Sequence, residues 1–195
     1  MVLGRLYEEG LGTKRDLAKA LAYYEFASQH SEPYGLYKIG TFLEQGIHHQ
    51  CIDGQPMREQ ALQYFREAQN QGILEQESLK EASFKVAQYF QYGYGVEKKN
   101  LTAAKVHYES AAADGHIESM NALGSLFFND MKDYDQAAAW FRKATERGHT
   151  RAICNLGICY ELGLGVEKDW NQAFIYYQES ADKGFIQAIY NLGFL

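Results

Sequence analysis

The sequence predicts an all-α fold built from about five helical hairpins, and three observations support this prediction. The 195-residue chain has only two prolines against 15 Tyr and 11 Phe, which favours long helices packed by aromatic rings. A Leu-Gly or similar pair recurs along the chain at intervals of 36, 47, 37, 33 and 36 residues. Between these pairs, an alanine is followed at helical spacing by large and small residues. A repeat period of this length is typical of arrays of helical hairpins.

The recurring pair marks the middle of the first helix of each hairpin. A glycine inside a helix costs about 1 kcal/mol relative to alanine, so its repeated use indicates that a second helix packs closely at this point. One copy has alanine instead, which shows that smallness is what the position requires. The pairs are Leu3-Gly4, Ile39-Gly40, Val86-Ala87, Leu123-Gly124, Leu156-Gly157 and Leu192-Gly193.

The second helix of each hairpin carries an alanine with rings three and four residues later and a small residue seven later. Offsets of three, four and seven place residues on one helix face. The alanine and the ring four residues later are Ala20/Tyr24, Ala61/Phe65, Ala104/Tyr108, Ala137/Phe141 and Ala173/Tyr177. Eleven residues after the alanine, four copies have a glycine, which suits the left-handed backbone conformation that often ends a helix. These glycines are Gly72, Gly115, Gly148 and Gly184.

The link between the two helices contains Gly-x-Gly in three copies, at residues 10–12, 93–95 and 163–165. A polar residue follows each link, and Asp16, Asn100 and Asp169 are expected to cap the second helices. A Gly-x-Gly motif can also bind phosphate, but that use requires a preceding strand. Because a helix precedes each of these links, we interpret them as turns.

In chain order, the pattern divides the sequence into one array of repeats. The repeats span residues 1–31 (partial), 32–72, 73–115, 116–148, 149–184 and 185–195 (the start of a sixth). The link at residues 47–56 is longer than the others, residues 73–80 extend the third repeat as helix or loop, and the fourth repeat has a short link at 129–134 without Gly-x-Gly. Because natural arrays end in a polar capping unit, the uncovered sixth helix suggests a piece of a longer repeat protein.

The run from Ala152 to Gly184 carries Ala-x-x-x-Leu-Gly-x-x-Tyr-x-x-Gly-x-Gly-Val, then Asp, Ala-x-x-Tyr-Tyr and Ser-Ala-x-x-Gly. This pattern resembles the Sel-1-like repeat family, relatives of tetratricopeptide repeats with a longer glycine-rich link. The resemblance covers essentially the whole chain, is most specific in the third and fifth repeats, and is closest to a plain tetratricopeptide unit in the fourth. It implies a right-handed α/α superhelix (solenoid). It also implies a non-catalytic scaffold or adaptor that binds a protein partner.

The resemblance further implies that the first helices line a concave surface where a partner peptide or protein binds. With tetratricopeptide geometry, positions −6, −3, +1, +4 and +5 from the central small residue face this surface. Rings and amides there suit an extended or helical peptide, although the rings could instead pack between neighbouring repeats. A carboxylate clamp would need several basic residues, and the set has one. It comprises Tyr34, Tyr37, Glu44, Phe84, Gln88, Gln91, Tyr92, Glu118, Asn121, Phe128, Arg151, Glu161 and Tyr190.

Composition and charge also bear on the class of partner and on the cellular location. The net charge of −6 and the absence of a basic stripe argue against nucleic acid as a partner, and no apolar run is long enough to insert in a membrane. Three cysteines favour a reducing, cytoplasmic location. The endoplasmic reticulum lumen or secretion stays open if the chain is a fragment, and only there would the sequon at Asn100 matter.

We expect no enzyme activity, no cofactor and no metal, because no catalytic constellation emerges from the spacing. The segment 48–53 holds His, Cys and Asp side chains that could bind Zn²⁺, but it lacks a second ligand pair. Cys154 and Cys159 are expected to be buried thiols, and His107 to be packed. One alternative is a secreted hydrolase of the Cys-rich Sel-1-like type, which carries a cysteine pair per repeat. Another is self-association through residues 185–195.

Overall fold

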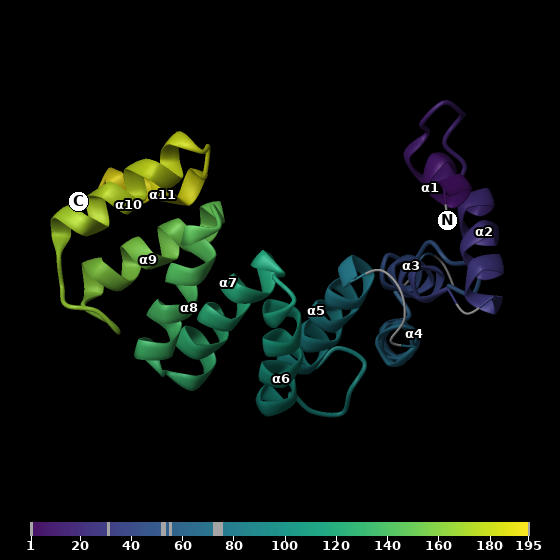
Figure 1. Ribbon diagram of the computed structural model, residues 1–195, viewed down its shortest axis with the longest axis horizontal. Coiled ribbons are helices and arrows are strands. Elements are labelled where there is room, and N and C mark those ends of the chain that lie inside the picture. The colour runs from purple at the N-terminus through teal and green to yellow at the C-terminus, as the bar shows by residue number, and fades with distance from the viewer. Residues whose placement is uncertain (1, 31, 52–53, 55, 72–75, 195) are drawn as a thin grey trace. The chain divides into compact units, whose positions relative to one another are not determined.

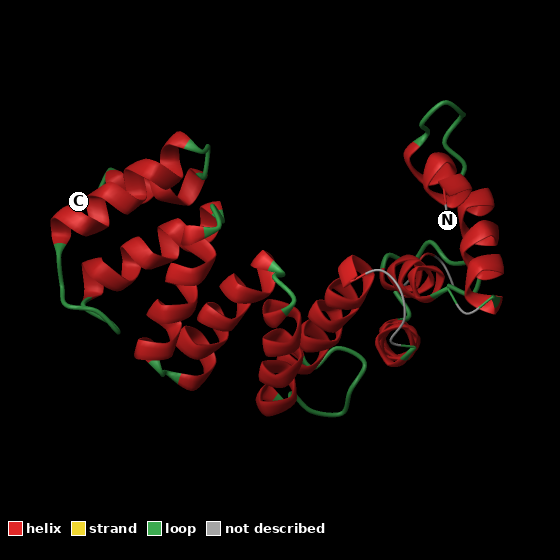
Figure 2. Cartoon of the chain, in the orientation of Figure 1, coloured by secondary structure: helices red, strands yellow, loops and turns green. Residues whose placement is uncertain are grey.

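The computed structural model describes residues 2–30, 32–51, 54, 56–71 and 76–194, with the side chains of residues 76 and 77 left aside. Every regular element in these segments is a helix (Figure 2), which confirms the all-α fold class. None of the helices described there is both long and apolar enough to cross a membrane. The chain divides into two compact units, Met1–Asp114 and Gly115–Leu195.

The first unit contains three hairpins, in which each helix packs against the next along the chain. Its buried core includes two pairs of rings that meet edge to face. The ring centroids of Tyr24 and Phe42 are 5.9 Å apart, and those of Phe65 and Tyr89 are 5.7 Å apart. The helices follow one another from purple to teal in Figure 1: α1 (Val2–Glu9), α2 (Leu17–Gln29), α3 (Pro33–Glu44), α4 (Arg58–Asn70), α5 (Gln76–Tyr92) and α6 (Leu101–Ala113).

The second unit contains two hairpins and a further first helix. Its first hairpin differs from the others because α7 runs on into a π-helical turn, η2, and Lys132, directly after this turn, has a left-handed conformation (φ 58°). Asp133 then caps the next helix by accepting a hydrogen bond from the Gln136 N–H at 3.1 Å. The elements are α7 (Ile117–Ser125), η2 (Leu126–Met131), α8 (Tyr134–Glu146), α9 (Thr150–Leu162), α10 (Trp170–Asp182) and α11 (Ile186–Leu192).

The small residue of each first helix lies directly against the ring of its second helix. A Cβ atom built on Gly40 would lie 2.7 Å from the Phe65 ring, and one on Gly157 would lie 2.7 Å from the Tyr177 ring. Ala87, at the same position of the third hairpin, is fully buried. The close packing predicted from the repeated small residue is therefore confirmed.

The turn and cap predictions are also confirmed where the structure describes them. Asp16, Asn100 and Asp169 accept hydrogen bonds at 2.9–3.1 Å from backbone N–H groups in the first turns of α2, α6 and α10. The glycines expected after the second helices, Gly115, Gly148 and Gly184, have φ values of 81–85°; Gly72 lies outside the described residues. Helix α5 begins at Gln76, so residues 76–80 extend the third repeat as helix.

The side chains expected to be buried also pack as predicted. Cys154 and Cys159 are at most 1% exposed, and neither forms a disulfide. His107 stacks on the Phe90 ring at 5.7 Å between centroids, and its Nδ1 lies 3.0 Å from the Gln69 amide nitrogen.

Replacing Gly157 with alanine should destabilise the second unit by about 1–3 kcal/mol, because the added methyl group would overlap the Tyr177 ring. Urea unfolding followed by circular dichroism measures this effect. Gly193→Ala is the matched control: Gly193 has the same repeat position and directly follows α11, and an added Cβ there would meet no ring and would come no closer than 3.3 Å to the Tyr190 carbonyl oxygen. A Gly157→Ala variant as stable as the parent would contradict the packing argument.

Candidate partner-binding surface

The side chain four residues after the central small residue forms a hydrogen bond with the second helix of the same hairpin. The Tyr24 hydroxyl donates to Glu8 at 2.6 Å, and the Tyr177 hydroxyl donates to Glu161 at 2.5 Å. In the third hairpin the Tyr108 hydroxyl donates to the Gln91 side-chain oxygen at 2.8 Å. Burial raises the pKa of Tyr24 most, and the hydrogen bond to the Glu8 carboxylate raises it further, so this hydroxyl keeps its proton. Two predicted partner-binding residues, Gln91 and Glu161, therefore hold their own hairpins together.

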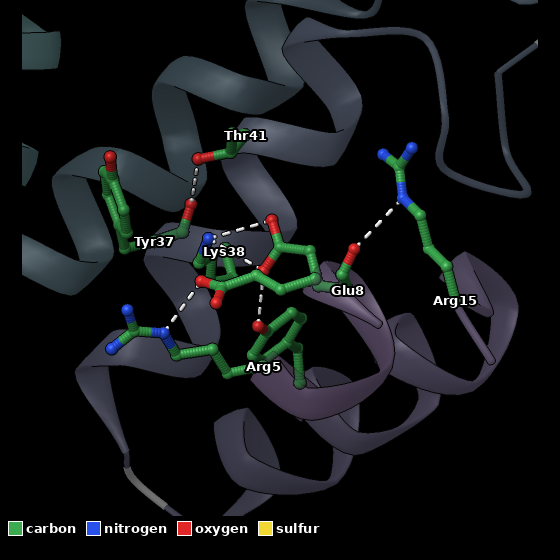
Figure 3. A network of polar contacts seen from close by, with 8 residues as sticks. Arg5, Glu8, Arg15, Tyr37, Lys38 and Thr41 are labelled. Atoms are coloured by element: carbon green, nitrogen blue, oxygen red, sulfur yellow. Dashed lines mark hydrogen bonds and ion pairs between the residues drawn. The ribbon is translucent and has the colours of Figure 1, made fainter. Parts of the chain in front are cut away.

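The position two residues before the small residue reaches back to the preceding first helix. Figure 3 shows Lys38, on α3, directed at Glu8, on α1, with Nζ and a carboxylate oxygen 2.9 Å apart. Lys85, on α5, forms the equivalent ion pair with Glu44, on α3, at 2.6 Å. All four side chains are less than a quarter exposed, and such shielding from water strengthens an ion pair. Glu44, another predicted binding residue, thus joins neighbouring hairpins.

In the second unit an amide replaces the lysine at this position. The Asn155 side chain donates to the Asn121 side-chain oxygen at 3.0 Å, which links α9 to α7. Asn121, one of the predicted partner-binding residues, is buried. Its amide oxygen is therefore used within the array.

The predicted rings on the first helices are partly buried against rings of other helices. Tyr34 meets Tyr24 edge to face at 6.0 Å, and Tyr37 lies 5.8 Å from Phe65. Burial raises the pKa of Tyr37 to about 12. Phe84 lies 5.7 Å from Tyr108, Phe128 lies 6.4 Å from Phe141, and Gln88 is also partly buried. Whether any of them touches a partner stays a prediction.

Four predicted residues have exposed side chains: Tyr92, Glu118, Arg151 and Tyr190. Two of them, Glu118 and Arg151, line a hollow of about 530 Å³ in the second unit. The Arg151 guanidinium lies over the Phe185 ring at 5.9 Å from its centroid. The remaining lining residues are Ile117, Arg147, Gly148, His149 and Thr150. This hollow therefore joins two arginines, one carboxylate and an aromatic ring.

Sequence reasoning missed Arg147 and Phe185, because both lie in or beside turns between repeats and the position rule covers only the first helices. The signal that could have found them is their place next to Gly148 and Gly184, the left-handed glycines that mark the turns between repeats. A larger hollow of about 980 Å³ lies between α1 and α2, with an apolar lining that includes Val2, Leu3, Tyr23 and Phe26. The predicted set contains none of these residues.

The Sel1 repeat model matches residues 1–31, 33–73, 80–116, 117–149 and 150–185. The chain belongs to the Sel1 repeat family. A Sel1 repeat protein from Oxalobacter formigenes has a similar structure, with a TM-score of 0.83 at 26% identity over 98% of this chain and 72% of that one. The protective antigen c5321 of uropathogenic Escherichia coli, which displays the same fold, has a TM-score of 0.81 at 25% identity over 99% of this chain and 39% of that one.

A curated relative of this Sel1 repeat chain is chitin synthase regulatory factor 3 of Schizosaccharomyces pombe. It is 24% identical over an alignment of 176 positions, and the match covers 84% of this chain. The match spans only 17% of that protein's length.

Tyr177→Phe should lower the free energy of unfolding by about 1–2 kcal/mol, because it leaves the partly buried Glu161 carboxylate without its hydroxyl donor. Urea unfolding measures the change. Tyr176→Phe is the matched control, since Tyr176 contacts Tyr160 through its ring. Equal effects of the two substitutions would show that the hydroxyl bond to Glu161 does not stabilise the hairpin.

His149 should make the second unit less stable in mild acid. Its Nδ1 accepts a hydrogen bond from the Ala152 N–H at the start of α9, and burial lowers its pKa below the usual 6.5. Below pH 6.5 the unfolded chain therefore binds more protons at this residue than the folded chain, so stability falls with falling pH. His149→Asn keeps a capping acceptor that does not titrate, and urea unfolding at about pH 7.5 and 5.5 should show a smaller pH effect. An unchanged pH effect would rule out this role.

Proposed function

We propose that this chain is a non-catalytic scaffold that binds a protein partner through the exposed part of its first-helix surface. Its membership of the Sel1 repeat family supports this class of function. The observation that carries the proposal is the hollow in the second unit, where the predicted residues Glu118 and Arg151 converge with Phe185. Most other predicted residues are bonded or packed within the array.

The lining favours a peptide segment that carries an acidic group beside an apolar residue. Arg147 and Arg151 supply guanidinium groups, which pair well with carboxylates. Phe185 and Ile117 supply apolar contact area. Glu118 adds a carboxylate that would favour a basic residue elsewhere on the partner. The sequence argued against a carboxylate clamp because Arg151 was the one basic residue of the set, and the structure adds Arg147 beside it.

The chemistry of the cysteines supports binding over hydrolysis. The Cys-rich hydrolase alternative depends on a disulfide in each repeat, whereas Cys51, Cys154 and Cys159 are unpaired. Burial raises the pKa of Cys154 to about 11 and that of Cys159 to about 12. Both are therefore poor nucleophiles at neutral pH. Free thiols also suit the expected cytoplasmic location, which stays a prediction.

The named relatives add a general direction to the proposal. One of them is named a chitin synthase regulatory factor, and a regulatory role is compatible with binding to another protein. We take from it only the expectation of a binding role. Self-association through the C-terminal end also stays a prediction, with Ile186 and Ile189 of α11 exposed at 80% and 55%.

Arg151→Glu should reduce partner binding at least about tenfold, because it replaces a guanidinium that lines the hollow with a carboxylate that would repel an acidic group of the partner. Affinity capture with quantitative mass spectrometry identifies the partners of the parent chain, and titration of the captured partner then gives the dissociation constants. Arg142→Glu is the control, because it makes the same charge change at an exposed position of α8. Equal binding by the two variants, both with parental helicity, would rule out the proposed site.

A further inference from the structure

The long link of the second repeat brings two histidines against the second helix of the first repeat. The Nε2 atom of His48 lies 3.4 Å from Oε1 of Glu25 on α2, and the Nδ1 atom of His49 lies 3.5 Å from the same oxygen. One potential ligand atom from each of the three side chains falls within 4.8 Å of the others. The two imidazole rings stack, with their centroids 4.3 Å apart.

These distances match what a small divalent cation requires. Zn²⁺ binds imidazole nitrogen and carboxylate oxygen at about 2.0–2.2 Å, and in a tetrahedral site this places neighbouring ligand atoms about 3.4 Å apart. The His48 and His49 nitrogens already lie at nearly this distance from the Glu25 oxygen. The His48 side chain is 2% exposed, while His49 is 62% exposed and Glu25 is 35% exposed. One ligand is thus held in place by packing, and the solvent side stays open to an ion.

We propose that Glu25, His48 and His49 form a binding site for Zn²⁺ or a similar divalent transition metal, with water as the fourth ligand. The ion would join Glu25, on α2 of the first repeat, to His48 and His49 of the second. Residues 48–53 by themselves contain no second ligand pair. Glu25, on the neighbouring repeat, supplies a further ligand beside His48 and His49. Asp53, part of that earlier ligand set, lies outside the described residues.

Metal binding requires one proton to move on His48. In the structure His48 Nδ1 accepts a hydrogen bond from the Gln50 N–H at 3.2 Å, so the neutral ring carries its proton on Nε2, directed at Glu25. Coordination through Nε2 would place the proton on Nδ1 and release the Gln50 N–H. Gln50 is exposed, so water can accept its hydrogen bond instead. His49 needs the same shift, because its Nδ1 also faces the Glu25 carboxylate; its side chain is 62% exposed, so the proton can lie on Nε2 and be bound by water.

The direct test is a titration of the full chain, free of any polyhistidine tag, with Zn²⁺ in competition with a chromophoric chelator. We expect one tight site per chain. His49→Gln and Glu25→Gln should each weaken it at least about tenfold, since each removes one of three protein ligands. Both side chains are partly or largely exposed, so neither substitution should unfold the chain. His30→Gln, in an exposed histidine at the end of the same helix α2, should leave the affinity unchanged.

Co²⁺ provides a second readout, because its absorption reports ligand geometry directly. We expect visible bands of tetrahedral intensity in the parent chain and in His30→Gln, and their loss in His49→Gln. Failure of the parent chain to compete for Zn²⁺ would overturn the proposal, and so would equal affinity of the parent and His49→Gln. Neither result would bear on the partner-binding hollow, which lies in the other unit.

Discussion

The close approach between each first helix and the ring of its own second helix is the contact on which the rest of the structure depends. Gly157 under Tyr177 and Gly40 under Phe65 leave no room for a side chain. This contact fixes the distance between the two helices, and the left-handed glycines then set where each helix ends. Because the hairpins share this contact, helices joined by links of different length pack against each other in the same way.

Polar groups on the first helices form further contacts, both within a hairpin and between neighbouring hairpins. Tyrosine hydroxyls bind Glu8, Gln91 and Glu161 within hairpins, and Lys38 and Lys85 join one hairpin to the next. These bonds occupy much of the face that a tetratricopeptide comparison assigns to a partner. Of the predicted residues that stay exposed, Glu118 and Arg151 lie in the first turns of α7 and α9, beside the turns between repeats.

The fold could be read from the sequence because its signals are local. The Asp16 cap and the Gly184 left-handed turn each follow from a few neighbouring residues. The surface was harder to predict, because a position rule gives the face of a helix but not its neighbours. Glu44 meets a lysine 41 residues away, and Glu25 meets histidines on another repeat. Arg147 was missed because it lies in a turn, where the repeat pattern assigns no role.

Amide hydrogen exchange, compared between the free chain and its complex with the captured partner, tests most directly where recognition takes place. We expect protection on binding in residues 147–151 and in the first turns of α7 and α11. The outer faces of α8 and α10 should exchange as in the free chain. Protection confined to α8 and α10, with residues 147–151 unaffected, would contradict binding through the first-helix surface.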